Sequence, residues 1–251
     1  RLFARLAGVD LEEAAEPVEA YPTLNAFFTR ALRSGVRPIA PEPDALVAPC
    51  DGEWGRSGRI EDGTLLQVKG QTYRVAELLA DAERARAYEG GSYATFYLAP
   101  RDYHRFHTPA AGTIRRVDHQ PGSLWPVNSI GLNGVERLFA RNERICAYLE
   151  ADRLGSASPA TPALALVAVG AMMVGSVRLS FDSLRTNVRR ARPERRELGE
   201  ASPHFERGEQ WGHFEFGSTI VLLTPPGRVE LRLRPPGERL RLGERIGRFL
   251  G

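Results

Sequence analysis

Beyond residue 51 the chain consists largely of short apolar runs separated by glycine and proline, and this pattern restricts it to a fold dominated by β-strands. Valine, isoleucine, threonine, tyrosine and phenylalanine recur in these runs, as they do in strands. The runs are TLLQV, YATFYLA, GTIRRV, ALVAVGAMMVGSV, STIVLLT and RVELRLR. Residues 74–88, RVAELLADAERARAY, form the only helix that we predict in this region. We therefore predict the fold class α+β, mainly β, with an antiparallel β-sandwich or a body similar to a barrel-sandwich.

The first 35 residues differ from this body, because their apolar side chains follow a helical period. The helical stretches are LEEAAEPVEA and TLNAFFTRALRSG, and the second ends at Ser34-Gly35. Residues 37–52 then contain four prolines, which predict an extended crossing segment. We divide the chain into an N-terminal helical segment, residues 1–35, and a β-rich domain, residues 36–251. The basic and apolar start, RLFARLAGV, predicts either a helix on a membrane surface or an amphipathic helix packed on the core.

Charge and cysteine content exclude some functional classes. The chain has 34 Lys and Arg against 31 Asp and Glu, a net charge of +3, which argues against a dedicated nucleic-acid-binding protein and permits attraction to anionic surfaces. Cys50 and Cys146 are the only cysteines, and their spacing fits neither a zinc motif nor a disulfide framework, so we expect a reducing compartment. The longest apolar stretch, Ala163–Val177, is shorter than the roughly 20 residues of a membrane-spanning helix.

Lys69 is the only lysine, since the remaining positive side chains are arginines. A pyridoxal phosphate enzyme needs a lysine for its Schiff base, and the VKGQTY context of Lys69 does not suggest one. Lys69 could instead accept a lipoyl or biotinyl group, which keeps a carrier module open as an alternative. Paired Pro-x-x-Gly turns at residues 49–52 and 109–112 are similar to those of such modules, although the modules are much shorter than this chain.

A first polar cluster, APRDYHRFHTP, places His104 and His107 beside Asp102 and Tyr103. The His-x-x-His spacing could bind a metal only if acidic or cysteine ligands converged on it, and neither HExxH nor CxxC accompanies it. We therefore predict no metal site. In a strand, residues three apart point to opposite faces, so the two histidines would have different tasks. One of them could also be an ordinary core or surface residue.

Two further features are weak signals by themselves. Asp51 precedes Gly52 in a CDG sequence, which is common turn chemistry. Ser218 follows Gly217 in HFEFGSTIVLL, and a glycine inside an apolar strand is typical of a bulge. Together with His107, Asp51 and Ser218 supply an acid, a base and a hydroxyl, the set that activates a serine nucleophile. A Ser-His-Asp hydrolase is thus one hypothesis, although no Gly-x-Ser-x-Gly elbow is present.

The order of several longer motifs resembles that of the phosphatidylserine decarboxylase proenzyme family, in its prokaryotic, pyruvoyl-dependent form. The motifs extend from about Tyr21 to Leu223 and are YPTLNAFFTRALRSGVRPI, VAPCDGEW, VKGQTYRVAELL, YLAPRDYHRFHTPAAGTI, PGSLWPVN, LFARNERI, VAVGAMMVGSV and RGEQWGHFEFGSTIVLL. The Asp-Tyr-His-Arg-x-His and Gly-Ser-Thr blocks are highly specific when they occur together. Trp125 stands where the family often has Phe, and Arg207 where it usually has Lys, and both keep the character of the replaced residue.

The resemblance implies that the chain cuts itself between Gly217 and Ser218. Ser218 Oγ would attack the carbonyl carbon of Gly217, whose missing Cβ allows the strained geometry. Elimination and hydrolysis would then convert residue 218 into a pyruvoyl group and release ammonia. The products would be a large β chain, residues 1–217, and a small α chain, residues 218–251, which together make residues 36–251 the catalytic domain.

Roles for the polar residues follow from the same resemblance. The self-cleaving triad would be Asp51, His107 and Ser218, with His107 as the base and Asp51 holding its imidazole in the required tautomer. The mature enzyme, a carboxy-lyase, would use the pyruvoyl ketone as an electron sink while phosphatidylserine loses CO2 to give phosphatidylethanolamine in phospholipid biosynthesis. His107 would return a proton, and His104 would contact the substrate carboxylate or share the proton transfer. Neither pyridoxal phosphate nor a metal would be needed.

The implied partners are an anionic membrane lipid and the enzyme's own fragments. The α and β chains would stay together as a heterodimer, with further dimerisation left open, and no nucleic acid would bind. The protein would be peripheral on the cytoplasmic face of the cell membrane. Either the N-terminal helices or the stretch 185–208 would contact lipid; this stretch carries six arginines from Arg185 to Arg196, and we expect it to be a mobile loop.

Overall fold

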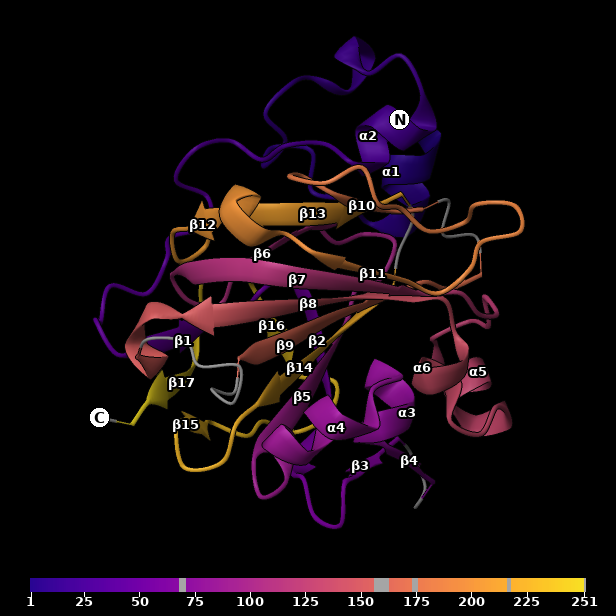
Figure 1. The fold of residues 1–251 in the computed structure, drawn as a ribbon. Coiled ribbons are helices and arrows are strands. Elements are labelled where there is room, and N and C mark those ends of the chain that lie inside the picture. Colours follow the sequence, from indigo (N-terminus) through magenta and orange to yellow (C-terminus); the bar gives the residue numbers. More distant parts are fainter. Residues whose placement is uncertain (68–70, 156–162, 173–175, 216–217, 251) are drawn as a thin grey trace.

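The computed structural model describes residues 1–67, 71–155, 163–172, 176–215 and 218–250. Strands predominate over helices within these residues, and the pairs between named strands are antiparallel. None of the sheets described closes into a barrel. The predicted class, α+β and mainly β, is confirmed (Figure 1).

A nine-stranded sheet forms the body of the molecule, with strand order β11-β7-β8-β9-β14-β5-β2-β16 and β12 paired to β7. Its strands are β2 (Gly52–Arg59), β5 (Ser92–Tyr97), β7 (Gly112–Gln120), β8 (Arg144–Ala151), β9 (Leu164–Val169), β11 (Glu194–Glu197), β12 (His204–Phe205), β14 (Thr219–Thr224) and β16 (Arg239–Leu240). The strand that follows the predicted cleavage point, β14, therefore lies near the middle of the sheet.

Smaller sheets complete the β structure. One has the order β10-β13-β6 and another the order β1-β17-β15, while β3 and β4 form a hairpin. Their strands are β1 (Ala45–Val47), β3 (Thr64–Leu66), β4 (Thr72–Arg74), β6 (Arg105–His107), β10 (Val177–Leu179), β13 (Gln210–Phe214), β15 (Val229–Leu231) and β17 (Arg245–Phe249). The predicted strand runs thus all contribute to sheets, although RVELRLR forms a strand only over Val229–Leu231.

Short helices lie at two places in Figure 1: α1 and α2 near the small sheet that contains β6, and α3 to α6 at the opposite end of the body. The α-helices are α1 (Leu2–Ala7), α2 (Leu24–Phe28), α3 (Val75–Leu79), α4 (Ala82–Ala85), α5 (Ser129–Gly134) and α6 (Leu138–Arg141). The 3-10 turns are η1 (Val18–Ala20), η2 (Arg86–Tyr88), η3 (Asp152–Leu154) and η4 (Gly199–Ala201).

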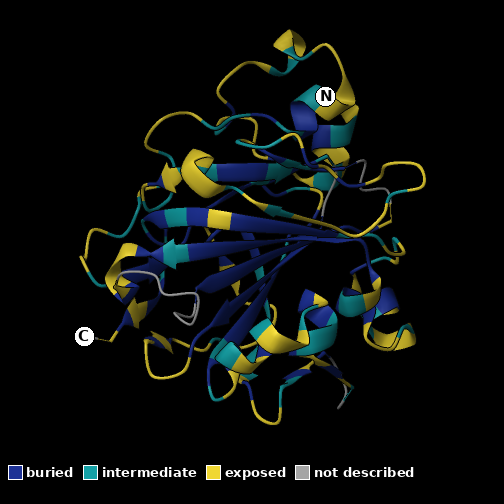
Figure 2. Cartoon of the chain, in the orientation of Figure 1, coloured by how far each residue is buried: buried dark blue, intermediate teal, exposed yellow. Residues whose placement is uncertain are grey.

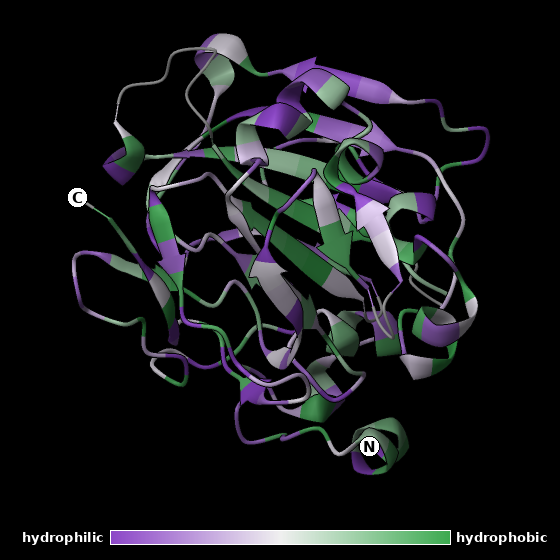
Figure 3. Cartoon of the chain, turned by 90° about the horizontal axis from the view of Figure 1, so that it is seen from below, coloured by the Kyte–Doolittle hydropathy of each residue, from purple (hydrophilic) through white to green (hydrophobic). Residues whose placement is uncertain are grey.

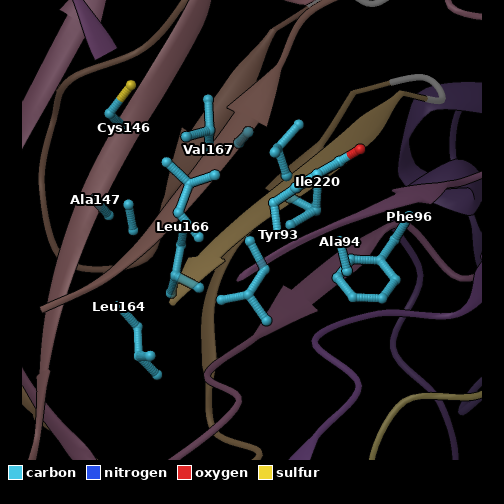
Figure 4. Packing of buried hydrophobic residues seen from close by; sticks show 14 of the residues in the cluster. Tyr93, Ala94, Phe96, Cys146, Ala147, Leu164, Leu166, Val167 and Ile220 are labelled. Atoms are coloured by element: carbon cyan, nitrogen blue, oxygen red, sulfur yellow. The ribbon is translucent and has the colours of Figure 1, made fainter. Parts of the chain in front are cut away.

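The core is centred on β9 and β14, in which every residue is buried (Figure 2). Strand β14 pairs along its length with β9 on one side and with β5 on the other. Because both faces of these strands are covered, their sequences are apolar throughout instead of alternating. Figure 3 shows these hydrophobic strands at the centre of the molecule, and Figure 4 shows Ile220, Leu166 and Phe96 among the packed side chains. The core therefore anchors the residues that follow Ser218.

The helix predicted over residues 74–88 is interrupted. Helix α3 ends because Ala80 adopts a left-handed conformation with φ of 51°. Asp81 then starts α4 by accepting a hydrogen bond from Arg84 N at 3.0 Å. The prediction of one continuous helix is therefore wrong. The helices α5 and α6 were not predicted; Asn128, which caps α5 with its side chain, was the available signal for the first of them.

The N-terminal 35 residues are less helical than predicted. Within residues 23–35 only α2 is helical, capped by the side chain of Thr23, and residues 11–20 contribute only η1. Pro17 immediately precedes η1 and cannot donate a backbone hydrogen bond to a longer helix. A bridge between Ala14 and Leu32 holds the two stretches in extended contact instead. The helical prediction for residues 11–20 is thus wrong over most of its length.

The arginine-rich stretch is also more ordered than predicted. Strand β11 within it pairs with β7 over four residues. Arg195 forms an ion pair with Asp81 at 3.0 Å, and Arg196 donates to Asp182. The expectation that residues 185–208 form a mobile loop is therefore wrong for this part of the stretch. Among the residues that the structure describes, no helix is long and apolar enough to cross a membrane.

Candidate active site

Ser218 immediately precedes β14 and is completely buried. Its carbonyl accepts a hydrogen bond from Leu98 N at 2.8 Å, which fixes the backbone at the end of β5. The hydroxyl, in contrast, has no hydrogen-bond partner among the described residues, and neither has Thr219 Oγ1 next to it. Gly217, the other half of the predicted cleavage site, lies outside the described residues. A buried hydroxyl without a partner is costly, and such groups are found where chemistry needs them.

Asp51 is buried between β1 and β2, and its carboxylate is almost fully used by hydrogen bonds. Arg37 donates from Nε to Oδ1 at 2.8 Å and from Nη2 to Oδ2 at 2.6 Å, and Leu242 N donates to Oδ1 at 2.9 Å. Gly52 makes the following turn possible: its φ is 152°, and a Cβ there would lie 2.3 Å from Tyr97 O. The CDG motif thus places the carboxylate where Arg37 and Leu242 can hold it.

Glu13 extends this ion pair into the N-terminal segment. Arg37 donates from Nη1 to Glu13 Oε1 at 3.0 Å and from Nη2 to Glu13 Oε2 at 2.6 Å. Arg37 therefore binds two carboxylates with one guanidinium, and it is itself almost completely buried. The hydrogen bond from Arg37 is also the main reason that the pKa of Glu13 lies below its usual value.

His107, in β6, is nine-tenths buried and bonded through both ring nitrogens. Nδ1 lies 2.9 Å from Gly208 O, and Nε2 lies 3.2 Å from Tyr103 Oη. A carbonyl oxygen can only accept, so Nδ1 carries the proton of the neutral ring and Nε2 carries the lone pair. Tyr103 therefore donates to Nε2. Nε2, which accepts the hydrogen bond from Tyr103, is therefore the basic nitrogen of His107.

Burial lowers the pKa of His107 to about 4, and the positive charge of Arg105 acts in the same direction. The bond to Gly208 and the charge of Asp51 raise that pKa, but they do not overcome the burial. His107 is consequently neutral at pH 7. Asp51 influences it through its electric field, because the hydrogen bonds among the described residues join Asp51 to Arg37 and Leu242 and join His107 to Gly208 and Tyr103.

His104 precedes β6 and is fully buried against Phe28 of α2, with ring centroids 3.9 Å apart. Among the residues that the structure describes, neither ring nitrogen makes a hydrogen bond of ordinary geometry, although a backbone contact with Asp102 acts to raise the pKa of the ring. Burial lowers the pKa of His104 to about 3, and the charge of Arg30 adds to this effect. The surroundings of the two histidines therefore differ, because His107 is bonded at both nitrogens and His104 has no such bond among the described residues. The spacing along a strand does not explain this difference, since His104 precedes β6.

Sequence reasoning missed three residues that decide the state of this region: Arg30, Arg37 and Tyr103. Each lies inside a motif that was recognised, in FFTR, VRPI and DYHR respectively, but a motif does not reveal which side chains are buried together. The structure gathers Asp51, His104 and His107 in one buried polar region with these three. No hydrogen bond among the described residues joins Ser218 Oγ to any of them.

A cavity of about 410 Å³ reaches the residue after Ser218. Trp54, Tyr97, Phe139 and Thr219 contribute to its lining, whereas Asp51, His104 and His107 do not. In the described part of the chain, no group of three or more His, Cys, Asp or Glu residues could hold a metal ion. Lys69, the acceptor of the alternative carrier hypothesis, lies outside the described residues.

Comparison with known proteins agrees with the motifs. A family model described as phosphatidylserine decarboxylase matches residues 24–248. The phosphatidylserine decarboxylase proenzyme of Anaeromyxobacter sp. (strain K) is 44% identical over 98% of this chain and 85% of its own length. The proenzymes of Acidovorax ebreus and Brevibacillus brevis are each 42% identical, over 100% and 88% of this chain and 86% and 77% of their own lengths. The resemblance predicted from sequence is confirmed, and the chain belongs to the phosphatidylserine decarboxylase family, a family of carboxy-lyases.

Proposed function

We propose that this chain is the precursor of a self-processing, pyruvoyl-dependent enzyme that converts phosphatidylserine to phosphatidylethanolamine and CO2. The observation that carries the proposal is the Ser218 hydroxyl, which is fully buried just before a central strand and has no hydrogen-bond partner in the described part of the chain. A structural serine at such a place would be bonded, since an unsatisfied buried hydroxyl costs roughly 1–3 kcal/mol. Because the chain belongs to the decarboxylase family, we assign this hydroxyl the role of the nucleophile in self-cleavage.

The proposed cleavage breaks the peptide bond between residues 217 and 218. Ser218 Oγ attacks the carbonyl carbon of Gly217, His107 Nε2 takes the hydroxyl proton and returns it to the departing amide nitrogen, and an ester replaces the amide. Loss of the Cα proton then breaks the Cβ–Oγ bond, so residues 1–217 leave with a terminal carboxylate. Water converts the dehydroalanine at position 218 to a ketone and releases ammonia.

The state of His107 supports its role as the base. Burial keeps its pKa near 4, so the ring is neutral at pH 7 and can accept a proton. Gly208 O holds the proton on Nδ1, a task that the resemblance had assigned to Asp51. In the proposed cleavage, Nε2 exchanges the Tyr103 hydroxyl for that of Ser218. Asp51 then stabilises the imidazolium that forms, through its field and not through a direct bond.

The residues around position 218 also fit the mature reaction. A pyruvoyl group supplies a ketone that takes up the electrons left behind when CO2 departs. Ser218 is completely buried, so the reacting carbon is shielded from water, and the neutral ring of His107 is suited to carry the proton in the proposed reaction. Strand β14 is paired on both sides, which supports the heterodimer: residues 218–251 stay attached after the cut.

For membrane contact, the N-terminal segment is better supported than the arginine-rich stretch. Helix α1 exposes Leu2 and Leu6 to 66% and 76%, one helical turn apart and next to Arg1 and Arg5. An apolar stripe flanked by cations is typical of helices that lie in the surface of an anionic bilayer. We propose that this segment binds the cytoplasmic face of the membrane peripherally.

Intact-mass measurement under denaturing conditions tests the proposal. The wild-type protein should give two chains with a break before position 218, and the smaller chain should be blocked to Edman degradation. Ser218→Ala should remain one chain of full mass. An uncut wild-type chain would contradict self-processing, and added mass on Lys69 would point to the carrier module instead.

The decarboxylation step needs its own measurement. Release of CO2 from phosphatidylserine should stop after borohydride reduces the ketone of the processed enzyme. Ser218→Ala, which has no ketone to reduce, should release no CO2 before or after the treatment. Activity that survives reduction would contradict the pyruvoyl mechanism.

A further inference from the structure

Three large apolar side chains are exposed on the connections at one end of the central sheet. Trp125, Ile130 and Met172 are exposed to 43%, 77% and 57%. Trp125 and Ile130 belong to the connection between β7 and β8, and Met172 lies just beyond the end of β9. Single exposed apolar residues are ordinary on a protein surface, so the grouping of these three matters more than the exposure of each.

Buried Asn142 ties the segments that carry these side chains to one another. Its Oδ1 accepts a hydrogen bond from Trp125 N at 3.0 Å, and its Nδ2 donates to Trp125 O and to Gly170 O, both at 2.8 Å. Helix α5, which carries Ile130, packs on the backbone before it, because a Cβ at Gly131 would lie 1.6 Å from Pro126 O. We call the surface formed by Trp125, Ile130 and Met172 the apolar rim.

The apolar rim lies at the end of the sheet where we propose that the chain is cut. Arg144 at the start of β8 pairs with Val169 at the end of β9, and Val169 pairs with Thr219 at the start of β14. The cavity of about 410 Å³ connects the two places, since Val127 and Leu132 line it together with Thr219. Thr219 Oγ1 is buried and makes no hydrogen bond with any residue that the structure describes. The cavity therefore has an apolar rim outside and a free polar atom inside.

Exposed cations flank the apolar rim. Arg141 belongs to the same connection, and Arg56 contributes to the lining of the cavity; both are exposed. Neither forms an ion pair within the described part of the chain, whereas Arg137 is paired with Glu77. The exposed Glu136 only partly offsets these charges. An apolar surface flanked by cations fits an anionic bilayer, which attracts basic side chains and takes up apolar ones.

We infer that the apolar rim enters an anionic bilayer and passes phosphatidylserine into the cavity, an inference that rests on the proposed function. Tryptophan is typical of the level of the lipid headgroups, because its ring is apolar and its N–H is polar. A cavity that opens in the bilayer surface spares the acyl chains of the substrate a passage through water. This contact is additional to the one proposed for α1, and it brings lipid to the end of the sheet where residue 218 lies.

Tryptophan fluorescence tests the inference directly, because the chain has three tryptophans and both Trp54 and Trp211 are completely buried. The uncut Ser218→Ala chain is mixed with vesicles of phosphatidylcholine and phosphatidylserine whose acyl chains carry bromine, a quencher that acts only at short range. Sedimentation with the vesicles measures binding separately. Emission from the bound chain should be quenched, and Trp125→Phe should bind equally well and lose the quenching. Bound protein without quenching would overturn the inference, because another segment would then hold the membrane, and so would a chain that does not bind vesicles.

Substitutions in the apolar rim should weaken the binding itself. Trp125→Ser and Ile130→Ser should each reduce the affinity for these vesicles about tenfold, the size expected when one apolar side chain no longer leaves water. Leu250→Ser is the matched control: Leu250 is 37% exposed and follows β17, on the side of the molecule opposite to α5 (Figure 1), and its loss should leave the affinity unchanged. Equal affinities in all three variants would overturn the inference. Melting temperatures establish that the variants are folded, and Ile130→Ser carries the test if Trp125→Ser is not.

Kinetics of the processed enzyme separate membrane contact from damage to the cavity. The ratio of decarboxylation of phosphatidylserine in vesicles to that of short-chain phosphatidylserine dispersed as monomers should fall about tenfold in Trp125→Ser and stay constant in Leu250→Ser. Equal losses with both substrates would contradict a role in membrane contact. Failure of the proposed function would be visible separately, as a wild-type chain that stays uncut and releases no CO2. Quenching and sedimentation use the uncut chain and would still decide whether the apolar rim enters the bilayer.

Discussion

Two buried polar regions meet at the proposed active site, and they are built in opposite ways. Around Asp51, each carboxylate oxygen accepts hydrogen bonds, and Arg37 is bound to both Asp51 and Glu13. In Ser218, His104 and Arg30, by contrast, buried side-chain N and O atoms have no hydrogen-bond partner among the described residues, although Arg30 lies over the Phe27 ring. A hydrogen-bond network in which every group has a partner holds its side chains in place. A buried polar group without a partner raises the free energy of the folded state, and a reaction or a ligand can remove that penalty. Under the proposed function, the first set holds side chains in place, and Ser218 in the second set is where the peptide bond is cut.

The apolar core offsets the free-energy penalty of burying hydroxyls without partners. Ser218, just before β14, and Thr219, its first residue, carry hydroxyls without partners among the described residues, and the strand continues into the fully buried, apolar Ile220 and Leu222. Burial of one such side chain stabilises the fold by about 1.5–3 kcal/mol. The apolar residues of β14 thus offset the free-energy penalty of the hydroxyls beside them. In the proposed cleavage, these apolar residues also keep position 218 fixed while the chain is cut.

The largest expected effect separates these two parts of β14. Ile220→Ala, introduced into the uncut Ser218→Ala chain, should lower the free energy of unfolding by about 3 kcal/mol, because it leaves a cavity in the core. Denaturant titration of the two uncut proteins measures this difference. In the wild-type background, Ile220→Ala should still be cut before position 218. A folded Ile220→Ala chain that stays whole would show that core and processing site are not separable.

The next effect compares the two buried arginines. Arg37→Gln should destabilise the uncut Ser218→Ala chain by about 3 kcal/mol, since it leaves Asp51 buried without its cation and leaves half-buried Glu13 with Arg241 alone. Arg30→Gln should destabilise the chain less, by about 1 kcal/mol, because Arg30 has two long bonds to carbonyls and a cation–π contact with Phe27 and no ion pair among the described residues. Chemical unfolding of both variants measures the contrast. If both variants lost the same free energy of unfolding, Arg30 would stabilise the fold as much as Arg37 does, and the contrast between the two arginines would be wrong.

A smaller effect should appear when the pH is lowered. The pKa values of His104 and His107 are about 3 and about 4 in the folded protein, below the ordinary value of about 6.5 that the unfolded chain would show. The unfolded state therefore binds more protons below pH 6.5, so stability falls as the pH drops from 6.5 towards 4. Between pH 7 and pH 5 we expect a loss of about 1 to 2 kcal/mol for each histidine.

Unfolding of Ser218→Ala at a series of pH values measures this loss. His104→Leu in the same background should reduce the slope by about one proton, whereas the surface variant Arg33→Gln should leave it unchanged. A slope that His104→Leu does not alter would mean that His104 is not held neutral by burial. The different surroundings of His104 and His107 would then not determine their protonation.

The sequence predicted those parts of the molecule that follow from local pattern. Runs such as STIVLLT and YATFYLA became the buried strands β14 and β5, because continuous apolar character requires two covered faces. Continuous helices were overpredicted, since Pro17 and the left-handed Ala80 end them sooner than the period of apolar residues suggests. The order of strands in the sheet was not predictable, because it depends on pairing between distant segments.

The candidate site shows the same limit. Motifs located Asp51, His107 and Ser218, but not the groups that determine their states. The partner of His107 Nδ1 lies 101 residues away in Gly208, and Leu242 reaches Asp51 from 191 residues away. Both donate or accept through the backbone, and a backbone group has no residue type that a motif could reveal. Burial of Arg30 without a partner was likewise invisible, because it is a property of the assembled fold.

The smallest expected effect concerns the boundary between the two regions, where Tyr103 bonds His107 Nε2 at 3.2 Å. Tyr103→Phe removes one hydrogen bond and should lower stability by about 1 kcal/mol. It also removes the group that occupies the lone pair of the proposed base, so Nε2 becomes free for the Ser218 hydroxyl. Self-cleavage should therefore persist and proceed at least as fast as in the wild type, as followed by denaturing gel over time. Tyr103→Leu provides the control for loss of the ring that packs on His107. If Tyr103→Phe abolished cleavage while remaining folded, the phenol would be part of the proton transfer, and the unsatisfied region would extend to Tyr103.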